Sequence, residues 1–167
     1  MKQNILLLLF IIFYFTTNVL SQDFFINQNK EVITLTNSNF VVIRGQITGK
    51  LASKVIIDLI EMRDKVIYLY ISSPGGSVVD GMKIIQVIKG LELSGKKIIC
   101  IADMALSMGF AILQYCSERV VMQSSILMQH QMSLQLGGSI NNVNSYVSFI
   151  HSMNDEVDKK QSEKLGI

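Results

Sequence analysis

The sequence contains no tryptophan, a single proline and only two cysteines among its 167 residues. With one proline and 17% charged residues, it lacks the composition of a disordered or linker-rich chain. Two cysteines are too few for a disulfide scaffold, and their spacing matches no zinc site. Basic residues exceed acidic residues by only two, so no excess of positive charge indicates nucleic acid. The chain is long enough for one domain with a real core. We expect no metal and no other cofactor.

Hydrophobic residues make up 49% of the chain, and part of them are concentrated at its start. Met1-Lys2 is a short positive region, and an unbroken apolar run follows over residues 5–15. This run is shorter than the ~20 residues that cross a bilayer as a helix, and its layout is typical of a secretory signal peptide. We expect residues 1–21 to be a cleaved signal peptide, or else an N-terminal anchor, with a buried core helix the least favoured interpretation. Residues 22–167 then form one domain outside the cytoplasm, either secreted or periplasmic.

A location outside the cytoplasm raises the question of whether Cys100 and Cys116 are bonded to each other. Cys100 lies in an apolar, strand-like run, and Cys116 follows a helix-like run. A disulfide needs Cα atoms within about 7 Å, which the spacing of the two residues does not establish. We expect two buried free thiols.

Beyond the N-terminal segment, continuous apolar runs alternate with apolar residues at helical spacing. Such apolar runs are typical of strands that are covered on both faces. Strands are expected at 40–43, 66–71, 97–101, 119–122 and 126–128, with a weaker one around 32–35. Helices are expected over about 51–60, 78–88, 107–115 and 141–164. The alternation predicts an α/β domain with right-handed crossovers.

Three loops follow expected strands, which is where ligands collect in open α/β sheets. The first loop, residues 73–78, contains Gly75-Gly76, whose missing side chains let the backbone approach a ligand closely. It also precedes a helix start, where free N–H groups stabilise negative charge. The segment fits half of an oxyanion hole, but by itself it more often marks a plain turn in which Ser77 caps a helix.

The other two loops each contain one residue suited to nucleophilic catalysis. Ser107 lies between small residues at a strand-to-helix transition, where a serine can be held exposed as a nucleophile. The commoner use of serine at such a position is a helix N-cap. His130 follows a short apolar strand and can act as a general base if it reaches the serine oxygen. An isolated histidine is more often a packed or surface residue, so no loop is decisive alone.

Taken together, the order Gly-Gly, Ser, His resembles the proteolytic subunits of Clp protease, within the wider crotonase-like superfamily. The resemblance covers about residues 40–160 and rests on several blocks, namely VIRGQI (42–47), IYLYISSPGGSV (67–78), LSMG (106–109), MQHQ (128–131) and LGGS (136–139). Several blocks in the right order are far more specific than one motif. The resemblance implies an α/β fold of stacked β-α-β units with a protruding handle helix.

By position, the resemblance makes Ser107 the nucleophile, His130 the general base, and the backbone amides of Gly76 and Met108 the oxyanion hole. The residues that match the family's peptide-binding strands are Gly75, Ser77, Val78, Ser133, Leu134 and Gln135. A serine needs a base to take its proton, and the developing oxyanion needs preorganised donors. The resemblance therefore implies a serine endopeptidase that cleaves peptides or unfolded polypeptides.

The sequence departs from the family at the third catalytic residue, an aspartate that lies beyond the handle helix. This sequence ends at Ile167, before the corresponding segment. Asp155 and Asp158 lie in the handle-like helix, and neither matches the catalytic position. A strand-to-helix bend gives Asp103 no reason to reach His130. We expect a C-terminally truncated chain first, and then a weak Ser–His dyad or an inactive relative.

Three alternative functions remain open. A membrane-associated serine–lysine peptidase of the signal-peptide-peptidase kind shares the superfamily, but no lysine stands at an obvious strand end between the His130 block and Lys159. A non-catalytic ring component would bind peptides or a partner without cleaving them. A crotonase-type acyl-CoA enzyme would leave the pair of Ser107 and His130 unexplained.

The expected partners are a peptide or unfolded protein substrate and other copies of the chain in a homo-oligomeric ring. Val147 and Ile150 form an apolar stripe on the handle-like helix, and we expect it to be too exposed for a monomer and to pair with a second ring. An ATP-driven unfoldase partner fits poorly with a signal peptide, because ATP is scarce outside the cytoplasm. No nucleic acid is expected.

Overall fold

The structure is a computed structural model that describes residues 33–131 and 138–165. The chain divides into two units, residues 1–34 and residues 35–167. The expected signal peptide lies outside the described residues, as do Ser133, Leu134 and Gln135. Residues 33–36 form no strand, and the rest of the weak strand expected there is outside the described range. Within that range, no helix has both the length and the apolar character needed to cross a bilayer.

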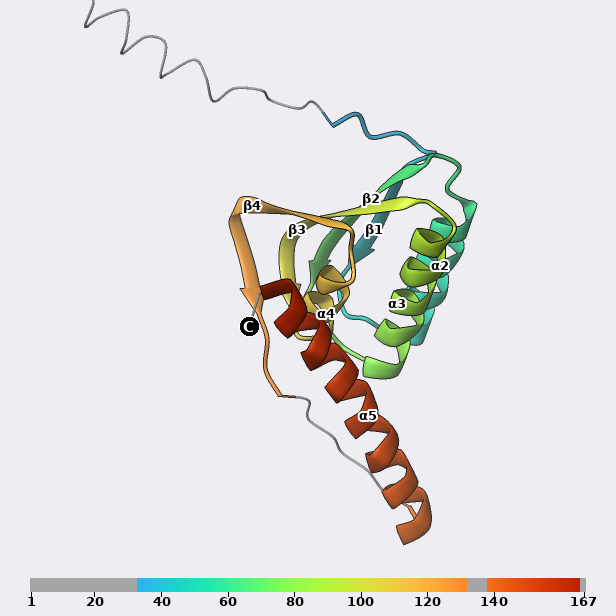
Figure 1. The fold of residues 1–167 in the computed structure, drawn as a ribbon, viewed down its shortest axis with the longest axis vertical. Coiled ribbons are helices and arrows are strands. Elements are labelled where there is room, and N and C mark those ends of the chain that lie inside the picture. The colour runs from blue at the N-terminus through green and yellow to red at the C-terminus, as the bar shows by residue number, and fades with distance from the viewer. Residues whose placement is uncertain (1–32, 132–137, 166–167) are drawn as a thin grey trace, which may run out of the picture. The chain divides into compact units, whose positions relative to one another are not determined.

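Strands and helices alternate along the second unit. They are β1 (Phe40–Arg44), α2 (Gly49–Glu61), β2 (Val66–Ser73), α3 (Val78–Leu93), β3 (Lys97–Leu106), α4 (Met108–Gln114), β4 (Glu118–Met128) and α5 (Ile140–Leu165). The four strands are parallel and lie in the order β1-β2-β3-β4 (Figure 1). The α/β fold expected from the alternating pattern is confirmed.

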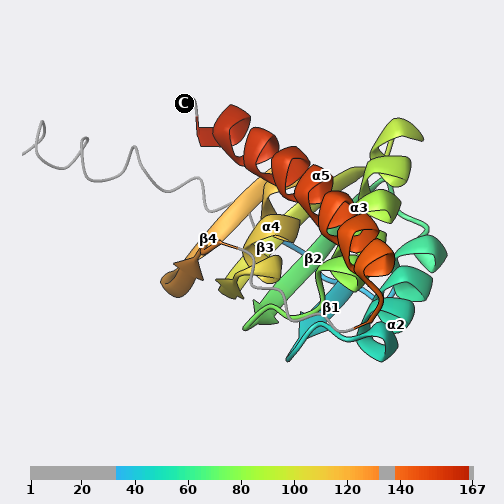
Figure 2. The same ribbon diagram turned by 90° about the horizontal axis from the view of Figure 1, so that it is seen from below.

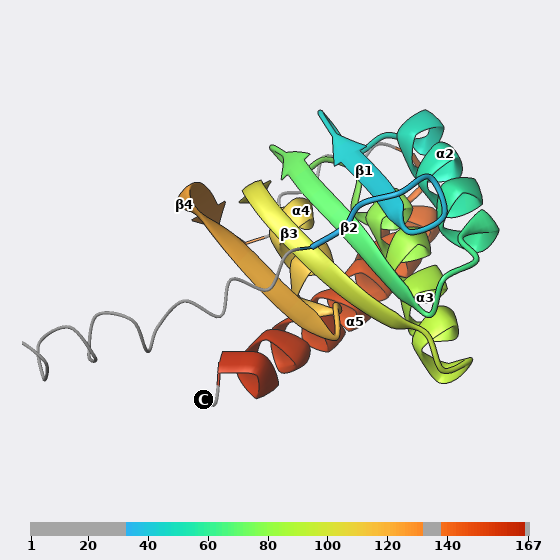
Figure 3. The same cartoon turned by 90° about the horizontal axis from the view of Figure 1, so that it is seen from above.

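The described helices all lie on one face of the sheet, as two opposite views of the molecule show (Figures 2 and 3). In β2, Leu69 and Ile71 point to that face and are fully buried, whereas Tyr68 and Tyr70 on the other face are half-buried. The expectation of strands covered on both faces is therefore wrong for the described residues. The two tyrosines explain why the prediction failed. In the sequence they count as apolar and make the run look continuous, but their hydroxyl groups allow the side chains to be partly exposed to solvent.

The edge strand β4 is continuous over Glu118–Met128, although the sequence pattern predicts two short strands there. Its register against β3 jumps, since Ala102 pairs with Val121 while Met104 pairs with Ile126. The residues between them form a wide bulge, and the Ser125 hydroxyl inside it donates to the Ala102 carbonyl at 2.6 Å. The bulge explains why polar residues interrupt an otherwise apolar strand.

The long helix α5 contacts α4, and its first turns extend away from the sheet (Figure 1). Ile150, Met153 and Val157 lie on its inner side and are buried, with exposed fractions of 8%, 7% and 1%. The expectation that Ile150 forms part of an exposed stripe is therefore wrong. Its spacing from Met153 and Val157 places it on the packed side, and Phe149 is an exposed apolar residue instead.

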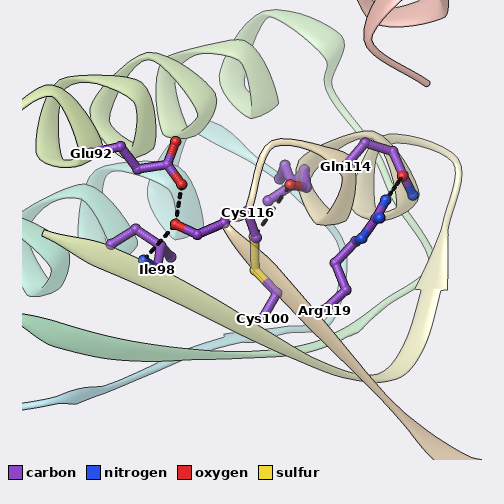
Figure 4. Close-up of a disulfide and its surroundings, with 8 residues drawn as sticks. Glu92, Ile98, Cys100, Gln114, Cys116 and Arg119 are labelled. Atoms are coloured by element: carbon purple, nitrogen blue, oxygen red, sulfur yellow. Dashed lines mark hydrogen bonds between the residues drawn. A yellow bond between two sulfur atoms is a disulfide. The ribbon is translucent and has the colours of Figure 1, made fainter. Parts of the chain in front are cut away.

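A disulfide joins Cys100 to Cys116, whose Cα atoms are 5.9 Å apart (Figure 4). The expectation of two free thiols is therefore wrong. Cys100 lies in β3, and α4 folds back over that strand so that Cys116, just beyond the end of the helix, meets it. Spacing along the chain could not show this approach, because it depends on how α4 packs.

Candidate active site

The glycine loop between β2 and α3 is held against the segment that precedes α2. The Ile47 N–H donates to the Gly75 carbonyl at 2.8 Å, and the Ser77 N–H donates to the Ile47 carbonyl at 2.9 Å. Ile47 and Gly76 thus form a parallel bridge. In this pattern the N–H and C=O of Gly76 itself point away from Ile47. Gly76 has a φ of +146°, and a Cβ atom there would stand 2.8 Å from the Ile47 nitrogen, so the loop requires glycine.

Ser77 caps the helix that follows the loop. Its hydroxyl accepts a hydrogen bond from the Asp80 N–H at 3.3 Å, at the start of α3. The Lys83 ammonium, 2.9 Å from Asp80 Oδ1, lowers the pKa of the Asp80 carboxyl, and the Ser77 hydroxyl lowers that pKa further by hydrogen bonding to the same carboxyl. The side chain of Ser77 therefore has a structural role, as the turn interpretation predicts.

Ser107 forms the corner between β3 and α4, and its backbone is strained. Its φ is +51° and its ψ is −119°, and it is the one non-glycine residue with positive φ in the described part of the chain. Its side chain does not cap α4, although it occupies the N-cap position. The N-cap interpretation of this serine is therefore not supported. Non-glycine residues with such dihedral angles are concentrated at active sites, including strand-to-helix turns that expose a nucleophile.

The glycine loop and the Ser107 corner are in direct contact. A Cβ atom on Gly75 would stand 2.7 Å from the Ser107 Cβ, 2.8 Å from the Leu106 carbonyl oxygen and 3.1 Å from the Met108 nitrogen. Gly75 therefore lies directly beside the first amide of α4. Across the described ranges, neither the Met108 nor the Gly76 amide donates a hydrogen bond to another residue.

His130 lies just past the end of β4, on the strand next to Ser107. The Ser107 N–H donates to the Met128 carbonyl at 2.8 Å, which places the end of β4 against the serine corner. The imidazole of His130 is exposed, and its Nδ1 lies 2.6 Å from the Gln131 carbonyl oxygen. No hydrogen bond between Ser107 and His130 is present in the described residues. The structure thus brings Gly75, Ser107 and Met108 together and places His130 nearby without joining it to Ser107.

His130 also lines a cavity of 560 Å³ between the end of β4 and α5. The cavity is lined by Gln129, His130, Gln131, Val147, Ile150, His151, Asn154 and Asp158. Asn154 donates to Asp158 Oδ2 at 2.6 Å within it. The sequence interpretation did not assign these α5 residues to the site. The sequence shows that these α5 residues share one face of a helix. It does not show that this face lies against the end of β4.

Asp103 lies at the bulge where β2 and β3 change register. Its Oδ2 accepts hydrogen bonds from the Tyr70 and Ser72 hydroxyls, both at 3.0 Å. This carboxylate therefore binds β2 side chains rather than His130, in line with the expectation from its position in the sequence.

The fold and this site define an α/β protein in which a strained serine lies beside a glycine loop. The chain belongs to the Clp protease family, whose model matches residues 26–167. It is similar to the ATP-dependent Clp protease proteolytic subunit 1 of Prochlorococcus marinus (strain MIT 9312). The two are 27% identical over 138 residues, covering 79% of this chain and 70% of the relative. The family resemblance inferred from the sequence is confirmed, and it starts earlier than the expected residue 40. Membership makes the protein a peptidase at the family level.

Proposed function

We propose that the protein is a serine endopeptidase that cleaves peptides or unfolded polypeptides, with Ser107 as nucleophile and His130 as general base. The observation that carries this proposal is the strained backbone of Ser107, whose φ is +51° and whose side chain does not cap the helix that it precedes. Strain of this kind persists only where the surroundings impose it, and it presents the side chain of a turn residue to solvent.

In the proposed reaction, Ser107 Oγ attacks the carbonyl carbon of the substrate while His130 Nε2 takes the hydroxyl proton. His130 then gives this proton to the leaving amine. Water hydrolyses the acyl-enzyme with the same histidine as base, which regenerates the free serine.

The oxyanion of the tetrahedral intermediate is proposed to bind the amides of Gly76 and Met108. Three features support this pair. The Gly76 N–H points away from Ile47, the Met108 N–H is at the start of α4, and Gly75 brings the two segments into contact. Fixed donors of this kind stabilise the charge that develops in the transition state, and loss of one costs on the order of a hundredfold in rate.

The orientation of His130 supports its role as base. With Nδ1 2.6 Å from the Gln131 carbonyl oxygen, the ring is stabilised in the tautomer that carries its proton on Nδ1. This leaves the lone pair of Nε2 free to accept the serine proton. In serine proteases an acidic side chain normally selects this tautomer, and here a backbone carbonyl lies within reach of the same nitrogen.

A peptide-binding ring component of low activity is the second candidate. The observation in its favour is the missing hydrogen bond between Ser107 and His130 in the described residues. Such bonds are often long in free enzymes and tighten on substrate binding, so we place the active peptidase first.

We further propose that the protein acts outside the cytoplasm and assembles into a homo-oligomeric ring. The Cys100–Cys116 disulfide supports the location, because disulfides persist in oxidising compartments. Proteins of the family form oligomeric rings. The relative from Prochlorococcus marinus is named as ATP-dependent. For this chain we propose cleavage of short or unfolded substrates without an ATPase.

A serine-directed fluorophosphonate tests the proposal. We expect the probe to label the full chain at Ser107, and the Ser107→Ala and His130→Ala variants to lose both labelling and hydrolysis of a fluorogenic peptide. Ser94→Ala, at the C-terminal end of α3, is a matched serine control that should keep both. Labelling that is equally strong in Ser107→Ala, or absent from the parent protein, would contradict the proposed mechanism.

A further inference from the structure

The disulfide encloses the candidate nucleophile in a short covalent loop. Cys100 lies in β3, and Cys116 lies beyond the end of α4, with a sequence separation of 16. Ser107 lies between them, at the corner where the strand ends and the helix begins. The S–S bond therefore connects β3, which precedes the corner, to the segment just beyond α4, which follows it. Figure 4 shows the bond between Cys100 and Cys116.

The corner needs support from both arms. Ser107 is held at a φ of +51°. This angle is unfavourable for an L residue, so the backbone relaxes to a negative φ unless the surrounding structure prevents it. The helix on one side, α4, is only seven residues long, too short to be stable by itself in water. If α4 could pivot on β3, the backbone of Ser107 would relax, and its hydroxyl would move relative to Gly75 and His130.

Polar contacts also hold the far end of α4, and each of them involves an exposed residue, either Arg119 or Ser117. Arg119 Nη1 donates to Gln114 Oε1 at 2.6 Å (Figure 4). The Ser117 hydroxyl accepts from the Ile98 N–H at 3.1 Å and donates to Glu92 Oε1 at 2.5 Å. Such contacts compete with water and each contributes modestly.

Apolar packing also holds α4, since Ala111, Ile112 and Leu113 are buried in the core, but such packing is non-directional. On the β4 side there is little cover, because the side chains of β4 are exposed along nearly its whole length. Cys100 and Cys116 are both 0% exposed. Within the described residues, their bond is therefore the one buried covalent cross-link, apart from the main chain itself, between β3 and the end of α4.

We propose that the Cys100–Cys116 disulfide is a positioning element that holds Ser107 in its reactive conformation, so that the peptidase is fully active only in its oxidised form. This inference rests on the proposed role of Ser107 as nucleophile. Bond formation removes two electrons and two protons from the thiol pair. They pass to a disulfide-bearing oxidant, which is itself reduced to two thiols, and reduction by a dithiol reverses the exchange.

The test compares two forms of the same full-length protein. One is the native disulfide form, and the other is unfolded in dithiothreitol and refolded as the dithiol, because a buried disulfide resists reduction in the folded state. We expect the dithiol form to react with the fluorophosphonate on the order of ten- to a hundredfold more slowly. Its kcat for a fluorogenic peptide should fall by the same factor with little change in KM. Reoxidation should restore both values.

Two further variants separate positioning from general stability. The double variant Cys100→Ala/Cys116→Ala lacks the cross-link without any reduction step, and it should show the same loss even if the dithiol form refolds poorly. Val55→Ala removes part of a fully buried side chain in α2, which packs against β1 and α3. It should lower the melting temperature and leave the labelling rate of the folded protein unchanged.

Equal labelling rates for the disulfide and dithiol forms would overturn the inference and leave the proposed function intact. Two free thiols in the active, native protein, measured by mass spectrometry after alkylation, would overturn it in the same way. No labelling of Ser107 even in the oxidised protein would instead refute the proposed function, and this inference with it.

Discussion

Gly75 and Ser107 are so close that a Cβ atom on the glycine would stand 2.7 Å from the Cβ of the serine. The two residues belong to different loops, one after β2 and one after β3. Their contact unites the glycine loop, the serine corner and the first amide of α4 in one site.

Replacing Gly75 should damage the fold and the site together. In Gly75→Ala the new methyl group meets Ser107 and the Leu106 carbonyl, at a φ of +94°. We expect the free energy of unfolding to fall by about 2–4 kcal/mol, from strain and overpacking combined, and labelling of Ser107 to be lost. Urea denaturation measures the first effect. Gly95→Ala is the control, because its φ is +88° with nothing within 4 Å, so it should lose only about 1 kcal/mol. Equal losses would contradict the close contact.

Ser107→Gly should make the protein more stable and inactive. Glycine adopts a φ of +51° without the strain that serine carries there. The relief of strain outweighs the extra flexibility of the unfolded chain, so we expect the free energy of unfolding to rise by about 0.5–1 kcal/mol. Ser107→Ala keeps the strain and should change stability little, which makes it the control. Both variants should lose peptidase activity. A glycine variant less stable than the alanine variant would show that the corner is not strained.

His130 should carry its proton on Nδ1 when it is neutral. The Gln131 carbonyl oxygen, 2.6 Å from Nδ1, stabilises that tautomer. Nitrogen-15 NMR of the imidazole at a pH where the ring is neutral distinguishes the two tautomers directly. Assignment of the His130 signals rests on comparison with His151→Ala, which removes the other histidine of the chain. A predominant Nε2–H form would contradict the proposed role as base.

Tyr115 should make stability depend on pH in the alkaline range. Burial raises the pKa of Tyr115 to about 12, and the charges of Glu156 and Glu163 add to this effect. The phenol of the unfolded chain ionises near pH 10. The stabilisation is therefore complete below pH 10 and is lost as the pH rises towards 12. We expect a loss of about 1 kcal/mol in the free energy of unfolding between about pH 9 and pH 11. Tyr115→Phe should remove this part of the alkaline loss, and an unchanged pH dependence in that variant would contradict it.

Much of the fold follows from local patterns in the sequence. The apolar runs at residues 66–71 and 97–101 became β2 and β3, and the helical spacing after residue 78 became α3. The glycine loop, Ser107 and His130 were each placed after a strand, and parallel strands put such loops at one edge of the sheet. These features depend on residues close together in the chain, so the pattern of side chains suffices to predict them.

Other features were missed because they depend on contacts between distant segments. The sequence indicated free thiols, yet the packing of α4 on β3 brings Cys100 and Cys116 together. It indicated an exposed stripe containing Ile150, yet the rotation of α5 buries that residue. The polar residues of α5 that lie beside His130 are part of no sequence motif. Which face of α5 meets the end of β4 depends on the path of the chain between them, and the sequence pattern does not give that path.

The sequence by itself determined the α/β class, the Clp protease family and the residues that are candidates for catalysis. The alternation of apolar runs and the order of the motifs are properties of short segments. They can therefore be recognised without knowing how the segments pack. Only the tertiary structure decided the strain at Ser107, the contact with Gly75 and the disulfide that encloses the corner. These arise where segments far apart in the chain share the same space, and close packing then dictates dihedral angles and distances that no single segment would adopt alone.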